Sequence, residues 1–245
     1  MDQLHREERI DYITQQLHII QSKQVFSFSI DAVLLARFTY VPITRGSIID
    51  LCSGNGVIPL VLSTRSSVPI TGIEIQPTLV DMANRSVHLN QLEHQIRIIQ
   101  ADVREKSLKN MTGQADLVTC NPPYFATPGE KEWNENPYLA AARHERNGTL
   151  EEIVEAASHL VKPRGKVAMV LRPERMMELL ELFRRYRIEP KQMKLIYPKE
   201  GKDANILLLE GTKNGKPRLR CLPPLTVYDS NGNYTEEFQK YYDGK

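Results

Sequence analysis

The chain has 245 residues, of which 41% are hydrophobic and 25% are charged, enough to bury one sizeable core and long for two. No run approaches the ~18 apolar residues of a membrane span, and the charged start is unlike a secretory signal, which predicts a cytoplasmic protein without membrane contact. The formal net charge is only +2, so a nucleic-acid partner would bind through local basic patches.

Alternating strands and helices are predicted along most of the chain. Short β-branched runs indicate strands at 47–51, 70–74, 96–100 and 116–120, and helical stretches separate them at 57–65 and 77–91. The alternation continues with a helix at 150–161, a strand at 166–172, a helix at 174–186 and two strands at 192–197 and 205–210. This order predicts an α/β fold, a mostly parallel seven-stranded sheet with one antiparallel strand and helices on both faces.

The segments outside this core are predicted to be additions to a single domain, residues 1–245. Residues 28–38 predict an amphipathic helix capped by Ser29 or Asp31, so 1–45 is described as an amino-terminal helical extension. The core spans 46–212, and 213–245 forms a tail that from about residue 216 fits neither strand nor helix. The segment 122–148 also fits neither, and a structureless loop of about 25 residues in a compact domain is usually functional.

The segment 48–56 (IIDLCSGNG) predicts a ligand site, because a strand there feeds a glycine-bearing turn that opens a helix. Gly54 and Gly56 let a nucleotide-like ligand approach bare backbone. A dinucleotide fingerprint needs a third glycine where Pro59 stands, which disfavours nicotinamide and flavin cofactors. Asp50, at the strand end, favours a cofactor with a cationic amino group.

Two more acids follow the next two strands. Glu74 closes one strand, where a carboxylate would meet the two hydroxyls of a ribose. Asp102 follows the other and could accept the amino group of an adenine, because an ionised carboxylate only accepts hydrogen bonds. We expect Asp50, Glu74 and Asp102 to line one crevice. The alternative is that the glycines form an ordinary turn and the acids cap strand ends.

Asn121, Pro122, Pro123 and Tyr124 form the most specific pattern in the chain, directly after the strand 116–120. The prolines stiffen the turn and fix the direction of its carbonyl oxygens. Methylation of an exocyclic amine requires a nitrogen that leaves conjugation with its ring and carries developing positive charge. The Asn121 side-chain oxygen and the Pro122 carbonyl would accept hydrogen bonds from that amine, and Tyr124 would stack on the planar group. An ordinary tight turn is the alternative.

The glycine turn and the three acids resemble those of the Rossmann-like class I methyltransferases, whose acids hold the methionine, ribose and adenine parts of S-adenosylmethionine. The sequence departs from the family at Cys52, where glycine is usual. The resemblance implies S-adenosyl-L-methionine as the cofactor, with these binding residues: Phe28, Asp50, Cys52, Ser53, Gly54, Asn55, Gly56, Glu74, Ile75, Asp102, Val103 and Asn121.

Longer segments resemble one bacterial family, which methylates the N6 amine of the adenine beside the anticodon, position 37, of a valine tRNA. The likeness covers nearly the whole chain and implies that Asn121–Tyr124 grip the adenine of a tRNA bound by its anticodon arm. Guanine-N2 rRNA methyltransferases and N5-glutamine protein methyltransferases have a similar motif, and a non-catalytic RNA- or cofactor-binding module stays a third alternative. The segments that carry the likeness are 26–38, 50–60, 72–76, 142–145 and 197–211.

The loop after Tyr124 is predicted to bind substrate, because it interleaves basic and aromatic side chains, although a lid that excludes water is the alternative. Two other basic clusters could be solvated faces or RNA contacts. The cysteines lack metal spacing, so no metal is predicted, and a monomer is the expectation. The predicted substrate residues are Tyr124, Phe125, Arg143, His144 and Arg146, and the clusters are Arg184, Arg185, Arg187, Lys191 and Lys194, then Lys213, Lys216, Arg218 and Arg220.

Overall fold

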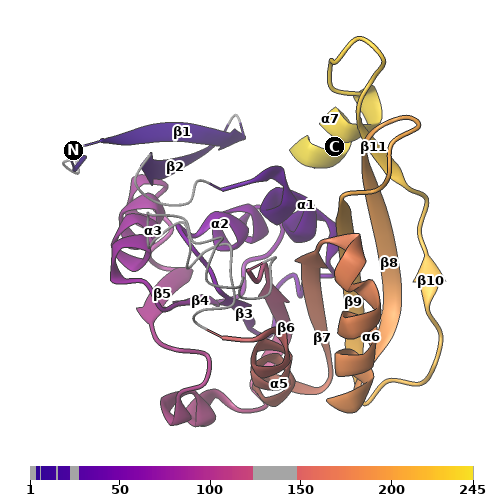
Figure 1. Cartoon of the computed structure of the whole chain (residues 1–245). Coiled ribbons are helices and arrows are strands. Elements are labelled where there is room, and N and C mark those ends of the chain that lie inside the picture. The colour runs from indigo at the N-terminus through magenta and orange to yellow at the C-terminus, as the bar shows by residue number, and fades with distance from the viewer. Residues whose placement is uncertain (1–3, 6, 15, 23–27, 124–147, 245) are drawn as a thin grey trace, which may run out of the picture.

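The computed structural model describes residues 4–5, 7–14, 16–22, 28–123 and 148–244 (Figure 1). Their main feature is one mixed sheet with helices on both faces, which confirms the predicted α/β fold. The strands of this sheet are β3 (Ile48–Leu51), β4 (Ile70–Glu74), β5 (Ile96–Gln100), β6 (Ala115–Cys120), β7 (Val161–Leu171), β8 (Ile188–Lys199), β9 (Ile206–Lys213), β10 (Arg220–Cys221) and β11 (Leu225–Tyr228).

The strand order is β10-β8-β9-β7-β6-β3-β4-β5, with β11 also paired to β8. β9 runs antiparallel to β7 and β8, and the other described pairs of this sheet are parallel, as predicted. Seven strands were expected and nine are present, because the tail adds β10 and β11 to β8. The chain passes from β3 to β4 on one side and later to β6 on the other. The strand order thus reverses at β3, the place where open sheets of this kind bind ligands.

Each face of the sheet has its own apolar core. One core lies under α1 (Ile30–Phe38), α2 (Val57–Ser63) and α3 (Pro77–Leu89), and the other under α5 (Leu150–Leu160) and α6 (Met176–Arg185). Local sequence explains where these helices begin: Pro77 opens α3, and Thr149 with Glu152 forms a capping box for α5. Two short 3-10 helices, η1 (Lys106–Met111) and η3 (Pro173–Arg175), also occur among the described residues. None of the described helices is long and apolar enough to cross a membrane.

The amino-terminal extension is not helical throughout, which corrects the prediction for 1–45. β1 (Glu8–Thr14) and β2 (Leu17–Ser22) form an antiparallel hairpin, and only α1 matches the helix expected at 28–38. Ser29 stands at the N-cap of α1 without a side-chain cap bond. The sequence did not reveal β2 because both faces of the strand are buried. Ile19 and Ile20, adjacent in β2, are 0% and 1% exposed, so polar and apolar residues do not alternate along it.

The tail is also ordered, so the prediction that it fits neither strand nor helix was wrong. Besides β10 and β11 it forms α7 (Glu236–Asp243), which lies beside α1 (Figure 1). Phe238 is 2% exposed, and its ring packs between Tyr234 and Tyr242 at centroid distances of 4.8 and 5.6 Å. Arg37 of α1 donates hydrogen bonds to the carbonyls of Tyr242 and Asp243 at the end of α7.

Candidate active site

A pocket opens at the carboxyl ends of the central strands, where the sheet order reverses. Its walls come from the loops after β3, β4, β5 and β6, together with the starts of α1 and α5. The structure therefore brings together most of the residues predicted for the cofactor and the amine. The lining residues are Phe28, Ala32, Cys52, Ser53, Gly54, Asn55, Val57, Ile58, Ile73, Glu74, Ile75, Gln76, Leu79, Ala101, Val103, Asn121, Pro122, Pro123, Gly148 and Ile153.

The loop after β3 turns sharply through three left-handed residues. Cys52, Gly54 and Gly56 have φ values of +53°, +56° and +88°. Glycine adopts this region freely, whereas a residue with a Cβ does so at a cost of about 1–2 kcal/mol. The positive φ at this position explains why glycine is usual there in the family. Cysteine adopts the same φ with strain. At Gly56 a Cβ would lie 3.3 Å from the Ala83 Cβ, so glycine lets α3 pack close to the loop.

Glu74 ties this loop to the next strand. Its carboxylate is 5% exposed and accepts hydrogen bonds from the backbone N–H groups of Gly54 at 2.9 Å and Gln76 at 3.0 Å. Burial raises the pKa of Glu74. Each carboxylate oxygen has two lone pairs, so the group retains capacity for ribose hydroxyls in the pocket that it lines.

Asp50 lies in β3 behind the pocket wall rather than in it. The side chain is 0% exposed, and one carboxylate oxygen accepts a hydrogen bond of 2.6 Å from the Thr119 hydroxyl. The other oxygen has no hydrogen-bond partner among the described residues. Burial raises the pKa of Asp50 to about 7, because an ionised carboxylate is poorly solvated there. A cationic group nearby would favour its ionised form.

Asp102 does not meet the other two acids. Arg104 binds its carboxylate through three hydrogen bonds and holds the pKa of that group below its usual value. The neighbours Ala101 and Val103 line the pocket, while Asp102 and Gly56 are not among its lining residues. Of the three predicted acids, the structure thus places Glu74 in the crevice, leaves Asp50 behind its wall and pairs Asp102 with Arg104.

Asn121, Pro122 and Pro123 line the same pocket as the loop after β3, residues 52–56. Cys120 pairs with Leu51 across β6 and β3, so Asn121 leaves its strand at the level where the loop begins. The Asn121 side-chain oxygen is buried and has no hydrogen-bond partner among the described residues. Tyr124 and the predicted substrate residues Phe125, Arg143, His144 and Arg146 lie outside the described residues.

Unpartnered oxygens test whether the pocket fits the expected cofactor. Ser53 Oγ, Gln76 Oε1 and Asn121 Oδ1 are all buried, line the pocket and accept no hydrogen bond from the described residues. Buried polar atoms are nearly always paired, so this pocket fits a ligand rich in donors. The hydroxyl, ammonium and amino groups of S-adenosylmethionine are such donors, so the lining fits this cofactor, and Glu74 in the pocket is the acid that would accept from it.

Several lining residues were not predicted from the sequence. Gln76 follows Glu74 closely, and its polar side chain at a helix start was the one available signal. Leu79 and Ala101 are apolar and indistinguishable in sequence from core residues. Gly148 and Ile153 enter the pocket from the start of α5, a contact that depends on the folded path of the chain. The other lining residues missed are Ala32, Val57, Ile58 and Ile73.

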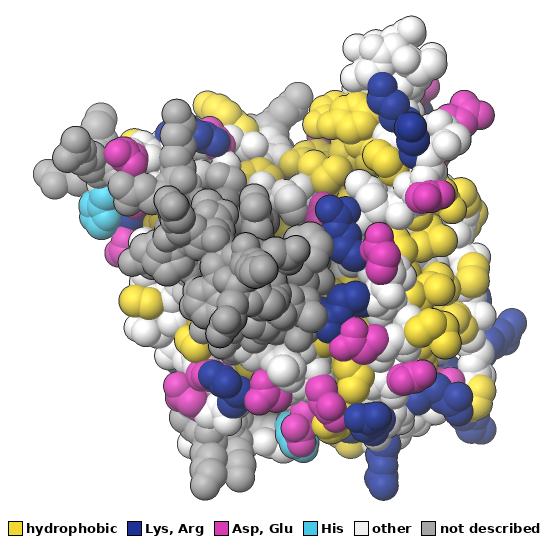
Figure 2. Space-filling model, in the orientation of Figure 1, with side chains coloured by type: hydrophobic (Ala, Val, Ile, Leu, Met, Phe, Trp, Pro, Cys, Tyr) yellow, Lys and Arg dark blue, Asp and Glu magenta, His cyan; other side chains and the backbone are white. Residues whose placement is uncertain are grey.

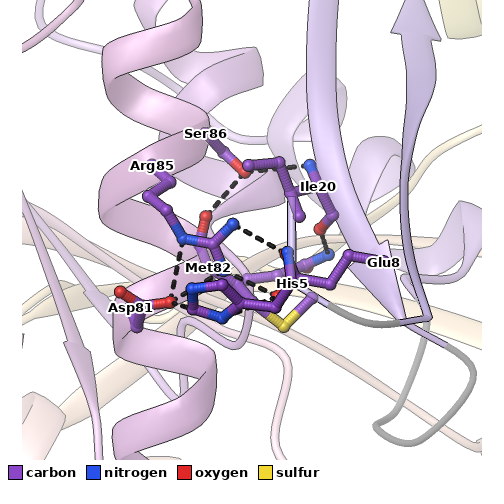
Figure 3. Close-up of polar contacts among 8 residues, drawn as sticks. His5, Glu8, Ile20, Asp81, Met82, Arg85 and Ser86 are labelled. Atoms are coloured by element: carbon purple, nitrogen blue, oxygen red, sulfur yellow. Dashed lines mark hydrogen bonds and ion pairs between the residues drawn. The ribbon is translucent and has the colours of Figure 1, made fainter. Parts of the chain in front are cut away.

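The amino-terminal hairpin is hydrogen-bonded directly to the loop after β3. The Asn55 amide nitrogen donates to the Ile20 carbonyl at 3.1 Å, and the Ile20 N–H donates to Ser86 Oγ at 3.0 Å. Arg85 of α3 makes two hydrogen bonds to Glu8, of 2.6 and 2.7 Å (Figure 3). The amide nitrogen of Asn55 therefore holds β2 in place, while the residue still lines the pocket.

A group of possible metal ligands lies at the same contact, formed by His5, Glu8 and Asp81. Arg85 stands between the two carboxylates and binds both, with an Asp81 ion pair of 2.7 Å (Figure 3). Its guanidinium neutralises the charge that a metal ion would need, so this group acts as an ion-pair contact between hairpin and helix.

The chain has relatives among known proteins. The family model for the methyltransferase small domain matches residues 16–195. A tRNA1(Val) (adenine(37)-N6)-methyltransferase from Haemophilus influenzae is 30% identical over 228 residues, covering 92% of this chain and 94% of the relative. One of the same name from Shewanella putrefaciens is 27% identical over 225 residues, covering 91% and 92%. A predicted O-methyltransferase from Agrobacterium tumefaciens shares the fold, with a TM-score of 0.69, 23% identity and coverage of 87% and 96%.

The fold, the pocket at the strand reversal and these matches define a class I S-adenosylmethionine-dependent methyltransferase. The chain belongs to the methyltransferase small domain family and, within it, to the group of bacterial relatives just described. The cofactor prediction is thereby confirmed, as is the predicted family resemblance.

Proposed function

We propose that this enzyme transfers a methyl group to the exocyclic N6 amine of an adenine in tRNA, at position 37 beside the anticodon of a valine tRNA. The names of the curated relatives support this substrate. The observation that carries the chemistry is the buried, unpartnered Asn121 oxygen at the pocket wall. It is an acceptor placed where an amine donor would complete its hydrogen bonding.

The residues of the chain bind and orient the amine. The cofactor supplies an electrophilic methyl group on a sulfonium. Asn121 Oδ1 and the Pro122 carbonyl accept the two amine hydrogens, which draws the nitrogen out of conjugation and turns its lone pair toward the methyl group. These fixed oxygens also stabilise the positive charge that develops on nitrogen. The methylated nitrogen is acidic enough to release its proton to water, so no strong base is required.

Asn121→Ala tests this role. Removal of one preorganised hydrogen-bonding group lowers kcat by about 10²–10³, while the cofactor Kd stays nearly unchanged because Glu74 and Asp50 remain. Asn84→Ala is the matched control, since Asn84 is an exposed amide on α3 that does not line the pocket. Loss of cofactor binding in Asn121→Ala would contradict the division of roles.

The substrate is tested with purified enzyme, valine tRNA transcript and labelled S-adenosylmethionine, followed by nucleoside mass spectrometry. N6-methyladenosine is the expected product, and a transcript with guanine at position 37 should accept no label. Label on guanine of rRNA or on glutamine of a release-factor peptide, with none on tRNA, would favour the other amine methyltransferases. A tRNA substrate places the enzyme in the cytoplasm, where we expect it to engage the anticodon arm as a monomer.

A further inference from the structure

A second hollow lies on the sheet at β7, β9, β8 and β10, away from the cofactor pocket. We call it the basic groove; its described lining residues all lie on strands or in the loop before β10. Lys191 belongs to one basic cluster of the sequence and Arg218 and Arg220 to another, so the fold unites two clusters that are separate along the chain. The lining residues are Lys166, Lys191, Gln192, Glu210, Arg218 and Arg220.

The positive charge of the groove is not cancelled. Among the described residues, Glu210 is the one acid that lines it; the side chain is 3% exposed, and its carboxylate accepts hydrogen bonds from Tyr40 N–H at 2.8 Å and Thr39 Oγ1 at 3.0 Å. Lys166 and Arg220 donate to neutral oxygens, those of Thr212 and Gln192. The four cations of the groove form no ion pair with any carboxylate in the described part of the chain.

On another face of the molecule many basic side chains have acidic neighbours. Figure 2 shows Lys and Arg interspersed with Asp and Glu over the face that carries α5 and α6. Arg185, for example, pairs with Glu151 at 2.8 Å. The basic groove differs because two lysines and two arginines gather there around a single acid, which leaves a net positive charge. Such a surface suits a polyanion, and arginine in particular suits phosphate, whose oxygens match its fork of N–H donors.

We infer that the basic groove binds the sugar–phosphate backbone of the RNA substrate while the target base enters the pocket. This inference rests on the proposed function. Arg220 is level with Thr119 of β6 and four strand spacings away, which is about 20 Å at ~4.8 Å per spacing. An RNA stem-loop that places one base at Asn121 spans that distance within several nucleotides. The row of paired residues that sets the level is Arg220, Gln192, Glu210, Ala168 and Thr119.

The test removes two charges at exposed positions. The Arg218→Gln/Arg220→Gln variant is compared with wild type and with Arg97→Gln/Arg184→Gln, which removes two exposed arginines from β5 and α6. The measurements are the Kd for valine tRNA between 50 and 200 mM salt, the kcat and KM for methylation, and the Kd for S-adenosylmethionine. Wild-type methylation in the same reactions reports on the proposed function separately.

Each lost phosphate contact reduces the steepness of log K against log salt by about 0.7–0.9, so the plot for the groove variant should be less steep by about 1.4–1.8. The ratio of its tRNA Kd to that of wild type then falls about ten-fold between 50 and 200 mM salt. KM for tRNA rises, whereas kcat at saturating tRNA and the cofactor Kd stay unchanged. The control variant keeps the wild-type slope.

A groove variant with the wild-type tRNA Kd and slope overturns the inference, as does an equal loss in the control variant. A changed cofactor Kd would indicate misfolding, and Lys191→Gln then serves as the second variant with the same expectation for one contact. If wild type binds tRNA with a groove-dependent slope but forms no N6-methyladenosine, the groove is supported and the proposed function fails.

Discussion

Asp50→Asn should change how the stability of the protein depends on pH. Folding moves the pKa of Asp50 from 3.8 to about 7, because the side chain is fully buried. A raised carboxyl pKa means that the folded state holds the proton more tightly than the unfolded state. The penalty on folding is therefore absent below about pH 4, grows as pH rises, and is complete above about pH 7. In full it corresponds to about 4 kcal/mol, as an upper bound.

Asparagine has nearly the same shape and does not titrate, so the variant escapes this penalty. Denaturant unfolding of both proteins under the same conditions, at intervals from pH 4.5 to 8, measures the difference in their free energies of unfolding. That difference should shift in favour of Asp50→Asn by about 1.4 kcal/mol per pH unit until about pH 7 and then stay level. A pH-independent loss of stability is also expected, because the buried side-chain NH2 of the asparagine has no hydrogen-bond acceptor there.

Two comparisons isolate the effect of Asp50. Glu74 also has a raised pKa and is present in both proteins, so the effect of its own burial is common to both, whereas its Coulombic coupling to Asp50 is part of the difference. Asp203→Asn, the same substitution at an exposed carboxylate, is the matched control. A flat difference for Asp50→Asn over the whole range would refute the reasoning that burial holds this carboxyl protonated.

Three further changes test the packing around the pocket. Glu8→Gln weakens the charged hydrogen bonds to Arg85 and should destabilise the docked hairpin by about 1.5–3 kcal/mol. The expected results are faster hydrogen exchange of the hairpin amides and a higher cofactor Kd. Unchanged exchange would show that the hairpin docks without this contact. Cys52→Gly should be more stable than Cys52→Ala by about 1–2 kcal/mol in chemical unfolding, since only glycine relieves the positive φ; equal stabilities would contradict the strain. Phe238→Ala should cost about 3–5 kcal/mol by the same measurement, and Tyr234→Ala, at a partly exposed ring, clearly less.

The core of the fold was predictable because each element carries its own signal. The β-branched runs before Asp50 and Glu74 and the helix opened by Pro77 are short-range patterns, and the structure has strands and a helix there. The glycine turn was predictable for a similar reason, since backbone that a ligand approaches closely needs residues without side chains. Asn121 was predictable because two prolines after it allow few conformations.

The additions to the core were not predictable, because long-range contacts create them. Ile19 and Ile20 are both buried, and the carbonyl of Ile20 is satisfied by Asn55 from a distant loop. β10 has two residues and exists only as an edge added to β8. The side chain of Asp102 was placed in the pocket by analogy with the other strand ends, whereas Arg104, two residues later, competes for it.

These additions act on the walls of the cofactor pocket. Phe28 and Ala32 line the pocket beside and within α1, whose far end is fixed by Glu210 of β9 and by the bonds of Arg37 to α7. On the other side, the hairpin bonds to Asn55 in the loop and to Arg85 on α3. The sheet supplies acids and the Asn121 oxygen at fixed strand ends, but the helix and loop that close around a ligand are held by the two termini. Weakening either terminus should therefore raise the cofactor Kd before it lowers kcat, because the acceptor that meets the amine belongs to the sheet.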